Sequence, residues 1–200
     1  MGTEQNEENE PERAKKERRT PIRVNGEWVY HYRYVPLDNA SIRDAVEQLW
    51  YPSQAAAVIA KYGPIAEWDV SEVEDFSELF CCKPNRTADL SGWDMGNAKD
   101  LRLMFLEATR FESDLSNWDV GNVENMSYMF SGARSFTSDL SKWDVGNVRN
   151  MSGVFKGATS FTSDLSKWDV GNVEDMTGVF KGATSFTSDL SKWEVGNVEN

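Results

Sequence analysis

A tryptophan recurs at a fixed interval of 25 residues through the last two-thirds of the chain. The six positions are Trp68, Trp93, Trp118, Trp143, Trp168 and Trp193. Columns of Leu, Phe and Asn keep the same period, so residues 68–192 make five complete units and residues 193–200 begin a sixth. The units that start at 143 and 168 differ only at Arg149/Glu174, Asn150/Asp175 and Ser152/Thr177. A period of this length indicates a repeat array in which each unit packs against its neighbours.

The spacing of apolar residues changes within one unit. Residues 143–145 alternate between apolar and polar, which predicts a short strand with Trp143 and Val145 inward. Gly146-Asn147 predicts a turn. Apolar residues then lie three or four positions apart over residues 148–158, which predicts a short helix. The sequence therefore predicts an α/β repeat solenoid with one short strand and one short helix in each 25-residue turn.

The segments before the repeats have a different pattern. Residues 1–20 are highly charged and predict a disordered tail. Residues 21–37 predict a strand, which could form one arm of a hairpin turned at Asn25-Gly26. Residues 38–67 hold two helical stripes, which predict an α-helical N-terminal cap for a solenoid over residues 68–200.

Local signals suggest where the two predicted helices and the array end. We expect Ser41 and Asp44 to cap the first helix, Pro52 to stop it and Ser53 to cap the second. The sixth unit stops after eight residues. This predicts a fragment of a longer array, whose uncapped C-terminal edge could make end-to-end contacts.

Charge and hydropathy exclude several classes of partner. The net charge is −12, and residues 68–200 hold 22 acidic against 12 basic side chains. Such a surface repels phosphate backbones, so nucleic acid is not an expected partner. The chain has no apolar run long enough to insert into a membrane. The polar first 20 residues do not resemble a secretory signal peptide, and the sequence leaves the localisation unknown.

The sequence offers little for catalysis. His31 is the only histidine, and no nucleophile elbow or phosphate-binding glycine loop is present. We therefore expect no enzymatic activity and no cofactor, although an enzyme domain could lie outside these residues. Adjacent Cys81 and Cys82 could bridge only through a strained ring, so we expect a structural or incidental role for them, with a metal site as a remote alternative.

The repeat W-D-V-G-N-V-x-N-M-S-x-M/V-F-x-G-A-x-S-F-x-S-D-L-S is similar to that of the BspA-type leucine-rich-repeat surface proteins. The resemblance is to the branch with 25-residue repeats found in mycoplasmal lipoproteins and in protist and algal proteins, and it covers about residues 40–200. It implies a leucine-rich-repeat-like solenoid that acts in cell-surface adhesion or protein–protein contact, without enzymatic activity.

The candidate partner-binding residues lie beside the repeated tryptophans. Side chains alternate along a strand, so those on either side of the tryptophan share the exposed face of the expected sheet. The candidates are Lys142, Asp144, Lys167, Asp169, Lys192 and Glu194. The partner would be a protein or a glycan, bound at identical sites that favour avidity. The alternative is a structural spacer without a ligand of its own.

Two other columns of repeated polar residues are expected to have mainly structural roles. We expect the repeated Asn side chains, such as Asn122 and Asn147, to bond backbone groups of the neighbouring unit. A second acidic column, which includes Asp139 and Asp164, could in principle bind calcium between units. Its spacing matches no known calcium motif, so calcium stays an alternative.

Overall fold

The structure is a computed structural model that describes residues 19–24, 27–32, 34–83 and 87–199, with only the backbone described for those before 34. Strands β1 (Arg19–Val24) and β2 (Glu27–Tyr32) pair antiparallel. The predicted hairpin turn at Asn25-Gly26 lies outside the described residues, as does nearly all of the predicted disordered tail.

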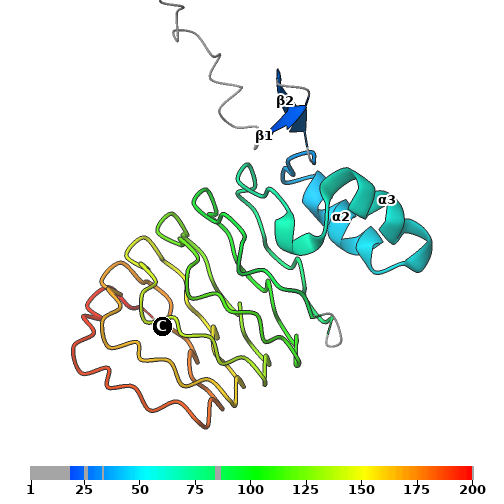
Figure 1. The fold of residues 1–200 in the computed structure, drawn as a ribbon. Coiled ribbons are helices and arrows are strands. Elements are labelled where there is room, and N and C mark those ends of the chain that lie inside the picture. The colour runs from blue at the N-terminus through cyan, green and yellow to red at the C-terminus, as the bar shows by residue number, and fades with distance from the viewer. Residues whose placement is uncertain (1–18, 25–26, 33, 84–86, 200) are drawn as a thin grey trace, which may run out of the picture.

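Two α-helices and a short 3₁₀ helix precede the repeats. They are α2 (Ser41–Leu49), α3 (Pro52–Tyr62) and η1 (Ile65–Glu67). Figure 1 shows α2 and α3 side by side at one end of the repeat array. Neither helix in the described part of the chain has the length and apolarity needed to cross a membrane.

The helix ends differ from the predicted ones. Ala40 holds the N-cap position of α2 and makes no side-chain cap hydrogen bond, while Asp38 Oδ1 accepts hydrogen bonds from the N–H (2.8 Å) and the hydroxyl (2.7 Å) of Ser41. The predicted capping through Ser41 and Asp44 is therefore wrong. Pro52 is the first residue of α3, where its fixed φ suits the helix and its missing N–H costs nothing. The predicted cap at Ser53 is wrong too, because Tyr51 holds the N-cap position.

The repeats contain neither predicted element. Among described residues from 68 to 199, no α-helix or β-strand is present, and successive units are joined by isolated parallel bridges such as Asp100 with Asn125. Figure 1 shows each unit as an irregular coil beside the next one. The prediction of an α/β repeat solenoid with a strand and a helix in each turn is wrong. The leucine-rich-repeat likeness implied by the resemblance is not supported either.

The direction of the backbone hydrogen bonds explains why no helix forms. In an α-helix each N–H donates to a carbonyl four residues earlier. Here the N–H of Met151 donates to the carbonyl of Asp175 (2.9 Å), and the N–H of Phe155 donates to that of Val179 (3.0 Å). Gly153, with φ +60°, turns the chain between them. The three-and-four spacing of apolar residues therefore comes from successive tight turns bonded to the next unit.

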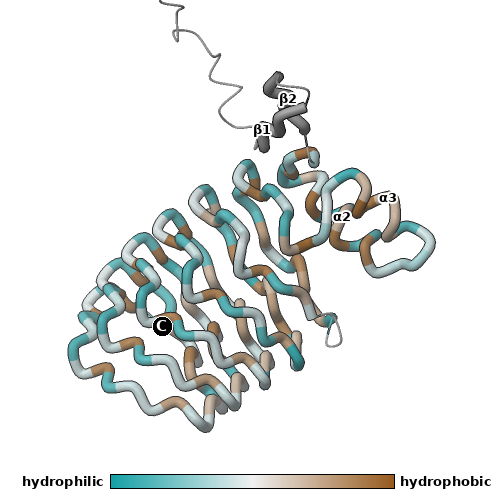
Figure 2. The backbone as a smooth tube through the Cα atoms, viewed as in Figure 1, coloured by the Kyte–Doolittle hydropathy of each residue, from teal (hydrophilic) through white to brown (hydrophobic). Residues whose placement is uncertain are grey.

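The core lies inside the stacked units, and the predicted inward residues of the unit from 143 are confirmed as buried. They are Trp143, Val145, Val148, Met151, Val154, Phe155, Ala158, Phe161 and Leu165. Figure 2 shows hydrophobic segments at matching places in successive coils. Equivalent rings stack from unit to unit, for example Phe105 on Phe130 with centroids 5.6 Å apart. Burial without regular secondary structure holds the units together.

A hydrogen bond fixes each repeated tryptophan. Trp143 Nε1 donates to the carbonyl of Leu115 (3.0 Å), 28 residues earlier in the chain. The same bond recurs at Trp93, Trp118, Trp168 and Trp193. The indole therefore satisfies a carbonyl just over one 25-residue period earlier in the chain, while its ring fills the core.

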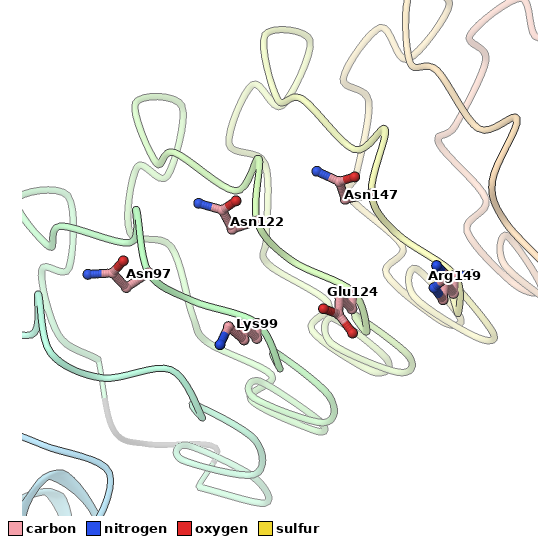
Figure 3. Close-up of a pocket in the computed structure, with 6 residues that line it drawn as sticks. All are labelled: Asn97, Lys99, Asn122, Glu124, Asn147 and Arg149. Carbon is pink, nitrogen blue, oxygen red and sulfur yellow. The ribbon is translucent and has the colours of Figure 1, made fainter.

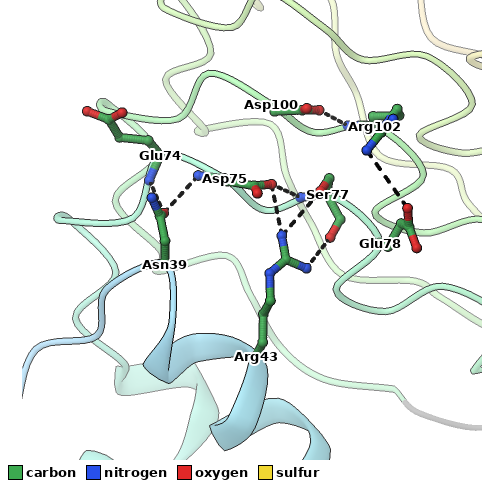
Figure 4. Close-up of polar contacts among 8 residues, drawn as sticks. All are labelled: Asn39, Arg43, Glu74, Asp75, Ser77, Glu78, Asp100 and Arg102. Carbon is green, nitrogen blue, oxygen red and sulfur yellow. Dashed lines mark hydrogen bonds and ion pairs between the residues drawn. The ribbon is translucent and has the colours of Figure 1, made fainter.

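Helix α2 is attached to the first unit by polar contacts (Figure 4). Asn39 Oδ1 accepts from the N–H groups of Glu74 (2.9 Å) and Asp75 (3.0 Å). The guanidinium of Arg43 donates to the Ser77 carbonyl (2.6 Å) and pairs with the carboxylate of Asp75 (2.9 Å). These side chains cover the first unit, where no earlier repeat is available to do so.

Candidate functional site

The six predicted binding residues are all exposed. Lys142 and Asp144 stand on either side of buried Trp143, and Lys167 and Asp169 repeat this arrangement around buried Trp168. We call the exposed residues Lys142, Asp144, Lys167, Asp169, Lys192 and Glu194 the Lys/Asp face. The face lies on irregular coil, not on the sheet that the sequence predicted.

The aspartates of this face also hold turns. Asp144 Oδ1 accepts from the N–H of Gly146 (3.0 Å), and Asp169 does the same for Gly171 (3.1 Å). Carboxylates of successive units approach the same turn: a Cβ built at Gly121 would lie 3.3 Å from Asp119 Oδ1 and 3.8 Å from Asp144 Oδ2. Turn N–H groups therefore offset the repulsion within this acidic column.

The lysines of the Lys/Asp face interact electrostatically with the second acidic column, which includes Asp139 and Asp164. No ion pair joins Lys142 to Asp144 or Lys167 to Asp169 among the residues that the structure describes. Hydrogen bonds from Ser141 and Ser163, and then the charge of Lys142, hold the pKa of Asp139 below its usual range. The lysine side chains are exposed, so a partner can contact them from solvent.

Serines bind the second acidic column across units. Asp139 Oδ1 accepts from the N–H of Ser141 (3.0 Å) and from the hydroxyl of Ser163 (3.0 Å) in the next unit. That hydroxyl in turn accepts from the N–H of Leu140 (2.8 Å). In the described ranges no group of three or more His, Cys, Asp or Glu side chains is placed to hold a metal ion. The carboxylates are engaged as hydrogen-bond acceptors that tie the units together.

The asparagine column has the predicted structural role. Asn122 Nδ2 donates to the Gly96 carbonyl (2.7 Å), and Asn147 Nδ2 donates to the Gly121 carbonyl (2.6 Å). The same bond recurs at Asn97, Asn172 and Asn197. Each Asn therefore links its own unit to the preceding one, although its side chain is exposed.

A charged column beside the asparagines was missed at the sequence level. It alternates in sign through Glu74, Lys99, Glu124, Arg149 and Glu174, and continues to a second glutamate at Glu199. Lys99 Nζ pairs with Glu74 (3.0 Å) and Arg149 pairs with Glu174 (3.1 Å). The Arg149/Glu174 difference between two near-identical units was the available signal.

The asparagines and this charged column line a shallow groove of about 340 Å³ (Figure 3). Its lining residues are Asn97, Lys99, Asn122, Glu124, Asn147 and Arg149. Figure 3 shows the three amides in the same orientation in successive units. The groove is polar and open, so it suits a surface contact better than an enclosed small molecule.

Comparison with known proteins gives one family. The family described as "Mycoplasma protein of unknown function, DUF285" matches residues 52–152 and 136–200, which together span more than half of the chain. No curated protein and no solved structure matches the sequence. The match agrees with a mycoplasmal repeat-protein family, and that family has no characterised activity. Its two matched segments contain every complete repeat, so the chain belongs to the DUF285 family.

Proposed function

We propose that the repeats form a non-catalytic module that binds a protein or glycan partner through the Lys/Asp face. The observation that supports this proposal most directly is that each pair of exposed charged residues stands on either side of a tryptophan whose position is fixed. Trp143 is buried and its indole donates to the Leu115 carbonyl 28 residues earlier, so Lys142 and Asp144 on either side of it are held outward. The same arrangement recurs one unit later, which presents a partner with equivalent sites and allows weak contacts to add.

Two further observations support this proposal. The repeated environments differ little from unit to unit, whereas an active site needs a unique set of perturbed groups. The repeat motif is similar to that of the BspA-type proteins, and this similarity implies adhesive or protein–protein contact. The alternating lysines and aspartates favour a charged protein surface over a neutral glycan.

Cross-linking of the full chain in an extract of source cells, followed by quantitative mass spectrometry, tests this proposal. We expect Lys142→Glu with Lys167→Glu to reduce capture of the partner about fivefold or more, because each reversal replaces an attraction by a repulsion. Lys156→Glu with Lys181→Glu is the matched control, since these lysines are exposed and lie in the same kind of unit. Equal effects of both pairs would contradict the proposal.

Asp144→Asn with Asp169→Asn separates binding from stability. Asparagine keeps the oxygen that accepts from the turn N–H and removes the charge. We expect capture to change while the unfolding midpoint stays close to that of the wild type. If the full chain shows no saturable capture of any partner, the array is a spacer, which is the other function predicted from its uniform units.

A further inference from the structure

Cys81 and Cys82 are adjacent in sequence, and their thiols lie on the same side of the chain. Neighbouring side chains of an extended chain point in opposite directions. Cys82 has φ +58°, and the two Sγ atoms are 3.1 Å apart. The N–H of Cys82 donates to the carbonyl of Leu106 (2.7 Å), and that of Cys81 donates to the carbonyl of Glu78 (3.0 Å). The backbone therefore holds the pair in place before any ligand binds.

The corner that carries the thiols recurs in every unit. Its left-handed position is occupied by Cys82, then by Glu107 (φ +54°), and afterwards by Gly132, Gly157 and Gly182. Two sulfur atoms meet there only in the first unit. Cys82 is exposed and Cys81 is half-buried, so a ligand from solvent can reach the pair.

The two sulfurs lie closer together than in a tetrahedral zinc site and farther apart than in a disulfide. Tetrahedral zinc with Zn–S bonds of about 2.3 Å places two sulfurs about 3.8 Å apart and requires two further ligands. The described part of the chain offers no group of three or more suitable side chains. A disulfide needs an S–S bond of about 2.05 Å and, between neighbours, a strained ring. If bonds from sulfur to a pyramidal atom have the length of about 2.3 Å that Zn–S bonds have, two that meet near a right angle place the sulfurs about 3.3 Å apart, close to the 3.1 Å between the two Sγ atoms.

We propose that Cys81 and Cys82 form a bidentate site for trivalent arsenic and similar pyramidal, thiophilic elements. A monosubstituted arsenous acid, R–As(OH)₂, would exchange both As–O bonds for As–S bonds. Each thiol proton leaves with one hydroxide, so two waters are released and nothing is oxidised or reduced. The proposal goes beyond the binding function above, because it concerns a different surface and a different ligand.

The environment of Cys81 affects the rate of this exchange. Burial is the main cause that raises the pKa of Cys81 to about 12, and the hydrogen bond with Cys82 and the charge of Cys82 add to it. Cys81 therefore reacts more slowly than an ordinary thiol, because the thiolate is the nucleophile, but the overall exchange still consumes two thiols and releases two waters.

Phenylarsonous acid added to the full chain tests the site. We expect one arsenical for each chain by intact mass, with both thiols lost to Ellman's reagent. Bidentate capture should survive an approximately 100-fold excess of mercaptoethanol and be reversed by dimercaptopropanol, because the second bond forms intramolecularly. Cys81→Ser and Cys82→Ser should each abolish the resistance to mercaptoethanol. Resistance that persists in either single variant would overturn the proposal.

Cysteine pairs introduced at other positions test whether capture needs the geometry of the corner or only two neighbouring cysteines. In a Cys81→Ser, Cys82→Ser background, Leu106→Cys with Glu107→Cys places the pair at the same left-handed corner and should restore capture. Ser116→Cys with Asn117→Cys places adjacent thiols where φ is not positive, and it should fail. Equal capture by both pairs, or tight zinc binding by the native pair, contradicts a site built by this corner.

Discussion

The side chain of Asn39 accepts the backbone hydrogen bond of Glu74 that a carbonyl of a preceding unit accepts elsewhere in the array. Its side-chain Oδ1 accepts from the N–H groups of Glu74 and Asp75 at 2.9 and 3.0 Å. One unit later, the carbonyl of Glu74 accepts from the corresponding N–H groups of Lys99 and Asp100 at 2.8 and 3.2 Å. A side chain before α2 thus completes the bonding pattern where the array has no preceding unit.

Replacing Asn39 should therefore loosen the start of the array. We expect Asn39→Ala to lower the free energy of unfolding by about 1–2 kcal/mol, because two N–H groups lose their acceptor while water partly replaces it. Urea denaturation measures the change. Gln54→Ala is the control, since this exposed side chain makes no hydrogen bond or ion pair among the described residues, and an equal loss there would contradict the role of Asn39.

Two glycines with the same backbone conformation should differ in their tolerance of alanine. Gly153 and Gly157 both have positive φ, at +60° and +70°. A Cβ at Gly153 would overlap the ring of Tyr128, whereas one at Gly157 would meet its nearest atom at 3.7 Å. We expect Gly157→Ala to cost about 1 kcal/mol from its backbone alone, and Gly153→Ala about 2–4 kcal/mol with the added overlap.

Thermal or urea unfolding of these two variants, with and without Tyr128→Ala, distinguishes backbone strain from overlap. Removing the ring should bring the cost of Gly153→Ala close to that of Gly157→Ala. A gap that remains in the Tyr128→Ala background would show that the ring is not its cause.

The serine-bonded acidic column should make stability sensitive to acid. Hydrogen bonds from Ser141 and Ser163 lower the pKa of Asp139, and those from Ser166 and Ser188 lower that of Asp164. A carboxylate whose pKa is lower in the folded state stabilises the fold above its unfolded pKa of about 3.9. That contribution is lost as the pH falls through the folded pKa.

Urea midpoints measured between pH 6 and pH 2 check this expectation. Asp139→Asn with Asp164→Asn keeps an acceptor oxygen in each position but removes the titrating group. The double variant should lose less stability than the wild type over this range. Parallel curves for the two proteins would mean that these carboxylates do not contribute to acid sensitivity.

The two cysteines should differ in reactivity toward alkylating agents. The pKa of Cys81 is raised to about 12, chiefly by burial, so its thiol stays protonated at pH 8.5 and reacts slowly, because the thiolate is the nucleophile. Iodoacetamide followed by fragment-ion mapping should find the label on exposed Cys82 first. Faster labelling of Cys81 than of Cys82 is the contrary result.

Much of the repeat could be predicted because burial follows periodicity. The 25-residue interval identified which side chains meet their equivalents in the next unit, and residues such as Trp143, Met151 and Phe155 are buried as expected. The asparagine column could also be interpreted correctly, since a repeated amide next to a turn has a repeated carbonyl within reach. Exposure of Lys142 and Asp144 followed from the same alternation.

The secondary structure could not be predicted in this way, because periodicity does not say where a backbone N–H finds its acceptor. The sequence by itself determined the period, the inward residues and the membership of each column. Only the tertiary structure decided that the N–H of Met151 bonds to the carbonyl of Asp175 in the next unit, so that turns replace the expected helix. It also decided that Asn39 covers the first unit and that the thiols of Cys81 and Cys82 share one side, since both depend on atoms that meet only when the units stack.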